Sequence, residues 1–273
     1  AYQLLLADAE GELEQAQELV IRAEGLMRFI PFHALLRGRH PDQSSPGRSK
    51  ASFVISRWVV SYLPISTPAT PLTCPHTATV LLPNYGRKAQ PILSGPSEAQ
   101  LVRLQGRAAQ ILRGRAATPG AMLSALSTPR SLVHFAGHAL ANLEHGGAPE
   151  LLFGPEESFG AATLRGVRVR SSLVVLASCT TAYTARFRGE RVRLARHPLH
   201  ESLLRVGAGA VIAASWGVKD AQSQAQMKTF YRHLEQRGPA EALALAQRER
   251  IARLRPPHPR FWAFYALYGA AHF

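Results

Sequence analysis

Cysteine is scarce in this chain, and its scarcity excludes two kinds of protein. The 273 residues include only Cys74 and Cys179, too few for a disulfide-stapled scaffold or a cysteine-based zinc site. Cys74 lies in a Pro/Thr-rich stretch, residues 67–76, and we interpret it as an ordinary loop thiol. A reducing, cytoplasmic setting is the simplest expectation.

Long apolar runs are also missing. No run of about 18 or more apolar residues occurs, so we expect no membrane span. The first residues have neither a basic start nor a cleavage site, which predicts no signal peptide. The chain begins without Met, as a fragment or a processed form would. A hydrophobic fraction of 46% is nevertheless ample for a packed core.

Acidic residues are in short supply. The chain has 18 Asp and Glu against 32 Lys and Arg, a formal net charge of +14. Such a charge suggests attraction to nucleic acid, a membrane surface or an acidic protein. However, the Arg residues are spread along the chain, and none of the helix, finger or aromatic–basic motifs of nucleic-acid readers occurs. We therefore do not expect nucleic acid to be the partner.

Short apolar runs and helical patterns alternate along most of the chain. This alternation predicts an α/β fold with a mostly parallel sheet and helices on both faces. Strands are expected at residues 2–7, 19–23, 53–62 (one or two), 78–83, 131–138, 150–153, 173–179, 210–216 and 261–268, the last ending the sheet. Helices are expected at residues 97–112, 119–128, 161–164 (one turn), 197–206, 220–237 and 240–254, and a mobile loop near residues 37–50.

Two of the predicted strands end in reactive side chains. Leu173–Cys179 (Leu-Val-Val-Leu-Ala-Ser-Cys) and Ser131–His138 are both short and apolar, as strands buried on two faces are. If they are neighbours, an imidazole lies beside a thiol, which can then act as a nucleophile. The plain alternative is that Cys179 is a small apolar core residue. A strand histidine such as His134 is likewise often only a hydrogen-bonded structural group.

Five segments together resemble a known family in their order and spacing. They are Phe29–Leu35, His134–His138, Leu173–Ala182, Gly207–Asp220 and His258–Trp262. These segments resemble the CHAT family of caspase-like cysteine peptidases, relatives of separase, and the match spans essentially the whole chain. The resemblance implies a caspase-like three-layer sandwich in a single domain, residues 1–273. Residues 1–130 would form its N-terminal part and residues 131–273 its catalytic part.

The resemblance also implies the roles of site residues. Cys179 becomes the nucleophile and His138 its partner, and the oxyanion hole uses the backbone N–H groups of Cys179 and Ala139. The family commonly has Gly where this chain has Ala139, Ala where it has Ser178, and an acidic residue where it has Thr180. The first departure affects backbone freedom, and we interpret the other two as neutral. Such a dyad needs no metal and no organic cofactor.

Asp220 and Trp216 are candidate substrate-binding residues. In separase-like relatives the acidic residue at the position of Asp220 selects Arg before the cut bond, since a carboxylate pairs bidentately with guanidinium. The alternative is that Asp220 only caps a helix. We expect Trp216 to line the cleft. The Arg-rich stretch 186–196 is interpreted as a solvated loop, with an activation or self-cleavage loop as the alternative.

The sequence and the resemblance thus predict a cysteine endopeptidase that cuts a specific protein substrate through an acyl-enzyme, with a basic residue before the cut bond as the expected preference. Family context suggests regulated bacterial proteolysis or defence, with a helical-repeat or regulatory protein partner. The main alternative is a catalytically silent caspase-like module that binds an acidic partner. A basic nucleic-acid-binding protein is a third hypothesis, which salt-dependent binding would reveal.

Overall fold

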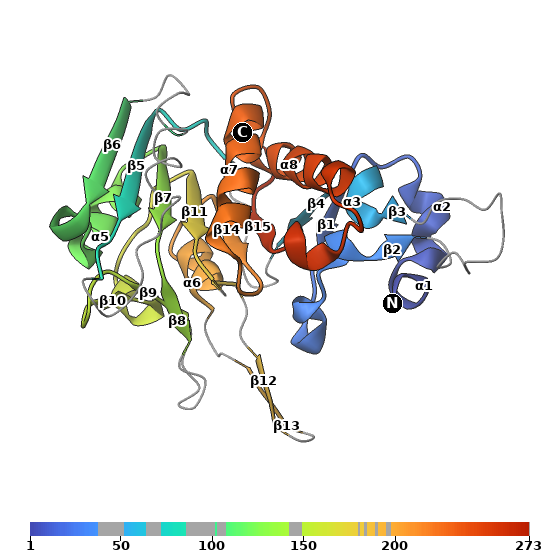
Figure 1. The fold of residues 1–273 in the computed structure, drawn as a ribbon, viewed down its shortest axis with the longest axis horizontal. Helices are drawn as coiled ribbons and strands as arrows, with labels where there is room; N and C mark the ends of the chain where they lie inside the picture. Colours follow the sequence, from blue (N-terminus) through green and yellow to red (C-terminus); the bar gives the residue numbers. More distant parts are fainter. Residues whose placement is uncertain are drawn as a thin grey trace.

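A sheet of eight strands forms the centre of the described part of the chain (Figure 1). The computed structural model describes residues 1–37, 52–63, 72–85, 102, 108–141, 149–179, 181–182, 185–188, 191–194 and 198–272. The strands lie in the order β1 (Glu18–Ile21), β4 (Val59–Tyr62), β15 (Tyr265–Gly269), β14 (Ala210–Ala214), β11 (Leu173–Ala177), β7 (Ser131–Ala136), β5 (Thr77–Leu82) and β6 (Ala108–Arg113). Every neighbouring pair is parallel except β14 with β15. The predicted mostly parallel sheet is confirmed.

Helices cover both faces of this sheet. On one face, α5 (Pro119–Ser127) and α6 (Leu199–Arg205) share an apolar cluster with Val133 and Phe135 of β7. On the other face, α7 (Asp220–Leu234) and α8 (Pro239–Arg253) share a second cluster with Leu132 of β7 and Val175 of β11. Because alternate residues of a strand point to opposite faces, one apolar run supplies both clusters. The three-layer sandwich is confirmed.

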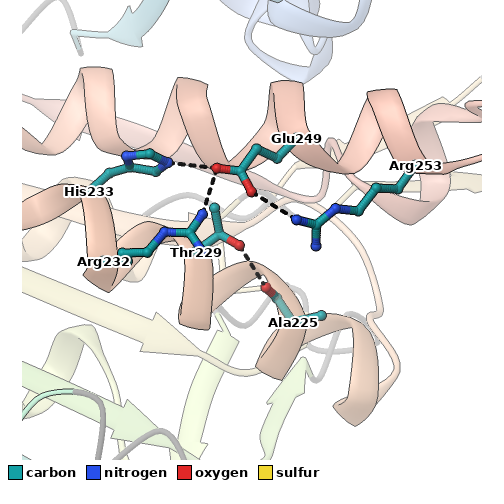
Figure 2. A network of polar contacts seen from close by, with 6 residues as sticks. All are labelled: Ala225, Thr229, Arg232, His233, Glu249 and Arg253. Atoms are coloured by element: carbon teal, nitrogen blue, oxygen red, sulfur yellow. Dashed lines mark hydrogen bonds and ion pairs between the residues drawn. The ribbon is translucent and has the colours of Figure 1, made fainter.

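An ionic network joins α7 to α8, as Figure 2 shows. The Glu249 carboxylate of α8 accepts hydrogen bonds from His233 Nε2 at 2.8 Å, Arg232 at 2.6 Å and Arg253 at 3.2 Å. Burial alone would raise the pKa of Glu249, but the hydrogen bonds from His233 and Arg232 lower it below its usual value. The helix pair is therefore held by charge as well as by its apolar faces.

Smaller elements surround the main sheet. A three-stranded antiparallel sheet contains β8 (Ala139–Ala141), β9 (Pro149–Leu152) and β10 (Ser158–Phe159). Two short pairs follow, β2 (Leu36–Arg37) with β3 (Ser52–Phe53), and β12 (Ala185–Arg188) with β13 (Arg191–Leu194). The other helical elements are α1 (Tyr2–Leu5), α2 (Glu10–Leu13), α3 (Val54–Arg57) and 3₁₀ turns at Ala7–Ala9, Gly25–Phe29, Phe32–Ala34, Gly114–Ala116, Ala161–Leu164 and Pro259–Phe261.

The N-terminal segment differs from its prediction. Residues 2–7 were expected as a strand, but they form α1 and the start of a 3₁₀ turn. Tyr2 is buried there while Leu4 is 88% exposed. A short apolar run does not by itself distinguish a strand from a helical turn, and here only one side of the run faces the core.

The helix expected at residues 97–112 is wrong at its C-terminal end. Residues 108–113 form strand β6, which pairs in parallel with β5 from Thr77 opposite Ala108 to Leu82 opposite Arg113. This edge strand is only partly buried, so its apolar residues are too sparse to show a strand pattern. Residue 102 is helical, and the rest of the expected helix lies outside the described residues.

The aromatic segment near the C-terminus is not an edge strand. The strand expected at residues 261–268 is β15, Tyr265–Gly269, preceded by a 3₁₀ turn at Pro259–Phe261. It lies inside the sheet between β14 and β4, and β1 forms the edge on that side. The expected strand at residues 53–62 is likewise divided, with α3 between β3 and β4.

The Arg-rich stretch was interpreted from the sequence as a solvated loop, but it contains two paired strands. Residues 185–188 and 191–194 pair as an antiparallel hairpin, β12–β13, which projects from the body at the bottom of Figure 1. Of the loop expected near residues 37–50, only residue 37 is described, so that prediction lies outside the described residues. No helix in the described ranges has the length and apolar character needed to cross a membrane.

Candidate active site

Strands β7 and β11 bring two reactive residues to the same edge of the sheet. The two strands pair in parallel, and their last paired residues are Ala136 and Ala177. His138 and Cys179 each come two residues after that pair, so the pairing places both at the carboxyl edge, where α/β sheets carry their ligands. The strands end two residues earlier than predicted, and both reactive residues are half-buried in the turns that follow.

The Cys179 sulfur is fixed against the segment that follows β14. The Val218 N–H donates a hydrogen bond to Sγ at 3.4 Å, and the Val218 carbonyl oxygen lies 3.5 Å from it. The next residues are tied to the end of β14, because Thr181 Oγ1 accepts from the Ala214 N–H at 2.9 Å and the Ala182 N–H donates to the Ala214 carbonyl. These contacts hold the half-buried thiol of Cys179 in one position beside Val218.

Tyr85 positions His138, and the sequence did not reveal it. The His138 N–H donates to the Tyr85 hydroxyl at 2.8 Å, and the two rings lie 4.7 Å apart between centroids. On its other side, the His138 carbonyl accepts from the Leu152 N–H at 2.9 Å. Tyr85 is 2% exposed, and burial raises its pKa to about 12, so the hydroxyl stays neutral. The only sequence signal is an aromatic residue shortly after strand β5.

Gly137 has a steric reason for its place before His138. A Cβ at this position would overlap the Tyr85 hydroxyl oxygen and lie 2.5 Å from the ring of Phe135. Contacts under 3 Å essentially never occur for real Cβ atoms. Glycine therefore lets Tyr85 approach the backbone closely enough to accept the His138 N–H.

Ala139 begins β8 and presents its backbone N–H away from β9. Ala139 is opposite Leu151, while the neighbouring Leu152 N–H bonds to the His138 carbonyl. Ala139 thus occupies a non-hydrogen-bonded position of the antiparallel pair, whose N–H points outward. The backbone N–H of Ala139 therefore points outward beside His138.

Asp220 and Trp216 flank Val218, the residue that contacts the Cys179 sulfur. Each is two positions from Val218, and both are half-buried. Helix α7 begins at Asp220 with Lys219 as its N-cap residue, so the interpretation of Asp220 as the N-cap residue is wrong. Its carboxylate still lies in the first turn, where the helix dipole favours negative charge. Trp216 donates from Nε1 to the Arg260 carbonyl at 3.5 Å and lines a cavity of about 60 Å³.

The histidine within β7 has a structural environment. His134 is fully buried, and its Nδ1 lies 2.6 Å from the Tyr231 hydroxyl of α7. It therefore faces the layer of α7 and α8, as a hydrogen-bonded core group. Within the described ranges, no group of three or more His, Cys, Asp or Glu side chains could hold a metal ion.

Comparison with protein families decides which family this is. The model of the CHAT domain matches residues 1–270, nearly the whole chain. The chain belongs to the CHAT domain family. The comparison with curated proteins found no match.

Solved structures share the fold of this CHAT domain. The Arg-specific cysteine proteinase gingipain R (RgpB) is 13% identical, with a TM-score of 0.57 over 78% of this chain and 54% of that one. The RgpB chain in the complex of Porphyromonas gingivalis RgpB pro- and mature domains is 14% identical, with a TM-score of 0.63 over 98% of this chain and 70% of that one. The matching chain of the Saccharomyces cerevisiae separase–securin complex is 12% identical, with a TM-score of 0.51 over 81% of this chain and 14% of that one.

These likenesses establish a caspase-like cysteine peptidase fold. At 12–14% identity they carry the fold alone. The chain also spans only about half the length of the gingipain R chain and a small part of the separase chain.

Proposed function

We propose that this CHAT domain is a cysteine endopeptidase that cleaves a specific protein substrate through an acyl-enzyme. The observation that carries the proposal is the parallel register of β7 and β11, which brings His138 and Cys179 to one edge of the sheet. Both residues are half-buried in turns that open to solvent, so a substrate can reach them. A structural cysteine has no need of this placement.

The reaction uses the two side chains in sequence. The His138 imidazole accepts the Cys179 thiol proton, and the thiolate attacks the carbonyl carbon of the substrate. The N–H groups of Cys179 and Ala139 donate to the oxyanion that forms. The C–N bond breaks as His138 gives its proton to the leaving amine. Water, deprotonated by His138, then hydrolyses the thioester and restores both residues.

The residue before the cut bond is proposed to be Arg or Lys, paired with Asp220. A substrate acylating Cys179 passes the segment 215–220, because the sulfur contacts Val218. Asp220 and Trp216 would then supply a carboxylate and an aromatic wall for the side chain. A guanidinium entering such a cleft needs a carboxylate, since an unpaired buried charge is costly. Gingipain R, which shares the fold, is an Arg-specific proteinase.

The dyad is tested by substitution and cleavage of a peptide mixture that varies residues on both sides of the cut bond. Cys179→Ala and His138→Ala should each abolish cleavage while keeping the wild-type circular dichroism spectrum. His134→Ala should lower stability more than activity, because His134 is fully buried and its Nδ1 lies 2.6 Å from the Tyr231 hydroxyl. If Cys179→Ala retains the wild-type rate, the peptidase proposal is wrong.

The specificity proposal has a separate readout. Wild type should favour Arg or Lys before the cut bond, and Asp220→Ala should lose that preference. If wild type favours small or aliphatic residues and Asp220→Ala has the same profile, Asp220 does not determine specificity. It is then only an acidic residue in the first turn of α7.

The biological setting proposed from the family is regulated bacterial proteolysis or defence, with a helical-repeat or regulatory partner. The products of neighbouring genes are the natural test set. Incubation of each with wild type and with Cys179→Ala should reveal one that only wild type cuts. If the domain folds but cuts none of them and no peptide, it is instead a catalytically silent binding module.

A further inference from the structure

The order of strands divides the candidate site into two sides. Along the sheet, β14, β11, β7, β5 and β6 follow one another toward the left of Figure 1. Cys179 follows β11, and His138 follows β7. In the proposed reaction His138 protonates the leaving amine, so that amine lies on the His138 side of the sulfur. The substrate segment after the cut bond therefore leaves toward β5 and β6, away from β14.

An open groove of about 720 Å³ lies on that side. Its lining includes Asn84 after β5, Arg115 and Thr118 between β6 and α5, and the turn of residues 153–157 between β9 and β10. This volume is within the range of roughly 300–1,000 Å³ that ligand sites occupy. The groove is large enough for several substrate residues.

On each wall of the groove, a lining residue is next in sequence to a residue that hydrogen-bonds to the His138 backbone. On one wall, Asn84 precedes Tyr85, whose hydroxyl accepts the His138 N–H at 2.8 Å. On the other, Phe153 follows Leu152, whose N–H donates to the His138 carbonyl at 2.9 Å. Asn84 and Phe153, which line the groove, are therefore the sequence neighbours of the two residues that hydrogen-bond to the His138 backbone.

The charge of the groove is opposite to that of the chain. Among the lining residues that the structure describes, Glu156, Glu157 and Arg115 are charged, which gives two negative charges against one positive, a net −1 for these three. All three are exposed. The whole chain carries a formal +14, so most of the molecule repels a basic peptide while this groove attracts one locally.

We propose that this groove binds the segment of a protein substrate that follows the cut bond, and that Glu156 and Glu157 favour Lys or Arg there. This inference rests on the proposed peptidase function and adds a specificity on the leaving-group side. It is independent of Asp220, which lies on the opposite side of Cys179.

The test is cut-site profiling of a synthetic peptide mixture by mass spectrometry, with residues varied on both sides of the bond. Wild type should enrich Lys or Arg at the first three positions after the cut by roughly 1.5- to fivefold, as exposed ion pairs allow. The double variant Glu156→Gln/Glu157→Gln should lose the enrichment, and Arg115→Gln should increase it. Raising the salt concentration should weaken it in wild type.

A matched control is Glu235→Gln, an exposed glutamate at the end of α7 outside the groove. It should keep the wild-type profile. Cleavage without any basic enrichment after the cut, or an enrichment unchanged in the double variant, overturns this inference and leaves the peptidase proposal standing. No cleavage of any peptide by wild type overturns both.

Discussion

Tyr85→Phe removes one oxygen atom and tests how the histidine is held. In wild type the Tyr85 hydroxyl accepts the His138 N–H at 2.8 Å, and the ring stays against the imidazole. Tyr85 is 2% exposed, so water does not readily replace the lost acceptor. An N–H left without a partner costs about 1–3 kcal/mol, and we expect a loss of unfolding free energy in that range.

The same substitution should lower kcat more than it changes KM. Tyr85 acts through His138, and a catalytic group misplaced by about 1 Å can lose on the order of a hundredfold in rate. We therefore expect kcat to fall by about ten- to a hundredfold. Urea unfolding and steady-state cleavage of a peptide identified by profiling give the two quantities.

Tyr231→Phe is the matched control. It removes a hydroxyl that lies 2.6 Å from His134, the histidine within β7 four positions before His138. Its stability should fall by a similar amount while kcat stays at the wild-type value. A wild-type kcat in Tyr85→Phe together with a reduced kcat in Tyr231→Phe would refute the assignment of His138 over His134.

Three further predictions concern packing, pH and a buried hydroxyl. Gly137→Ala should destabilise the fold by about 1–3 kcal/mol and inactivate it, because its Cβ would displace Tyr85; urea unfolding and peptide cleavage check this. Burial lowers the pKa of His33 to about 4 and that of His200 to about 3. Below about pH 6.5 the unfolded chain therefore binds more protons than the folded chain, so the free energy of unfolding decreases as the pH is lowered. His33 alone accounts for about 3 kcal/mol of this loss between pH 6.5 and 4. Urea unfolding from pH 4 to 7 should show this slope, reduced in His33→Gln, and an unchanged slope would contradict the assignment. Ser178→Ala should keep wild-type activity and be as stable or up to about 1 kcal/mol more stable, because the buried Ser178 hydroxyl has no hydrogen bond among the described residues; a large loss of stability would show a partner.

The sequence was most informative where strands are buried on both faces. β7 and β11 are mostly apolar because every residue of each is buried, and this made the two strands, and the place of His138 and Cys179 at one edge of the sheet, predictable. The prediction needed only that the two strands be neighbours. It did not need the loops that follow them.

Other features depend on contacts between distant segments. Tyr85 lies 53 positions from His138, and no local pattern indicates that its hydroxyl reaches that backbone. Strand β6 is a half-exposed edge strand defined by its pairing with β5, so its residues resemble a helix face equally well. The interior place of β15 depends on β4 and β1 joining the sheet beyond it.

The chain carries its own control for a direct test of the dyad. Cys74 is an exposed free cysteine, whereas Cys179 is half-buried beside Val218. A peptide with Arg at its end and a thiol-reactive ketone would be incubated with the protein and the adduct mapped by mass spectrometry. We predict modification of Cys179 and not of Cys74, strongly reduced in His138→Ala, while a simple alkylating reagent modifies Cys74 equally in both proteins. Equal peptide labelling of the two cysteines, or labelling of Cys179 unaffected by His138→Ala, would contradict the proposal that these residues form a catalytic pair.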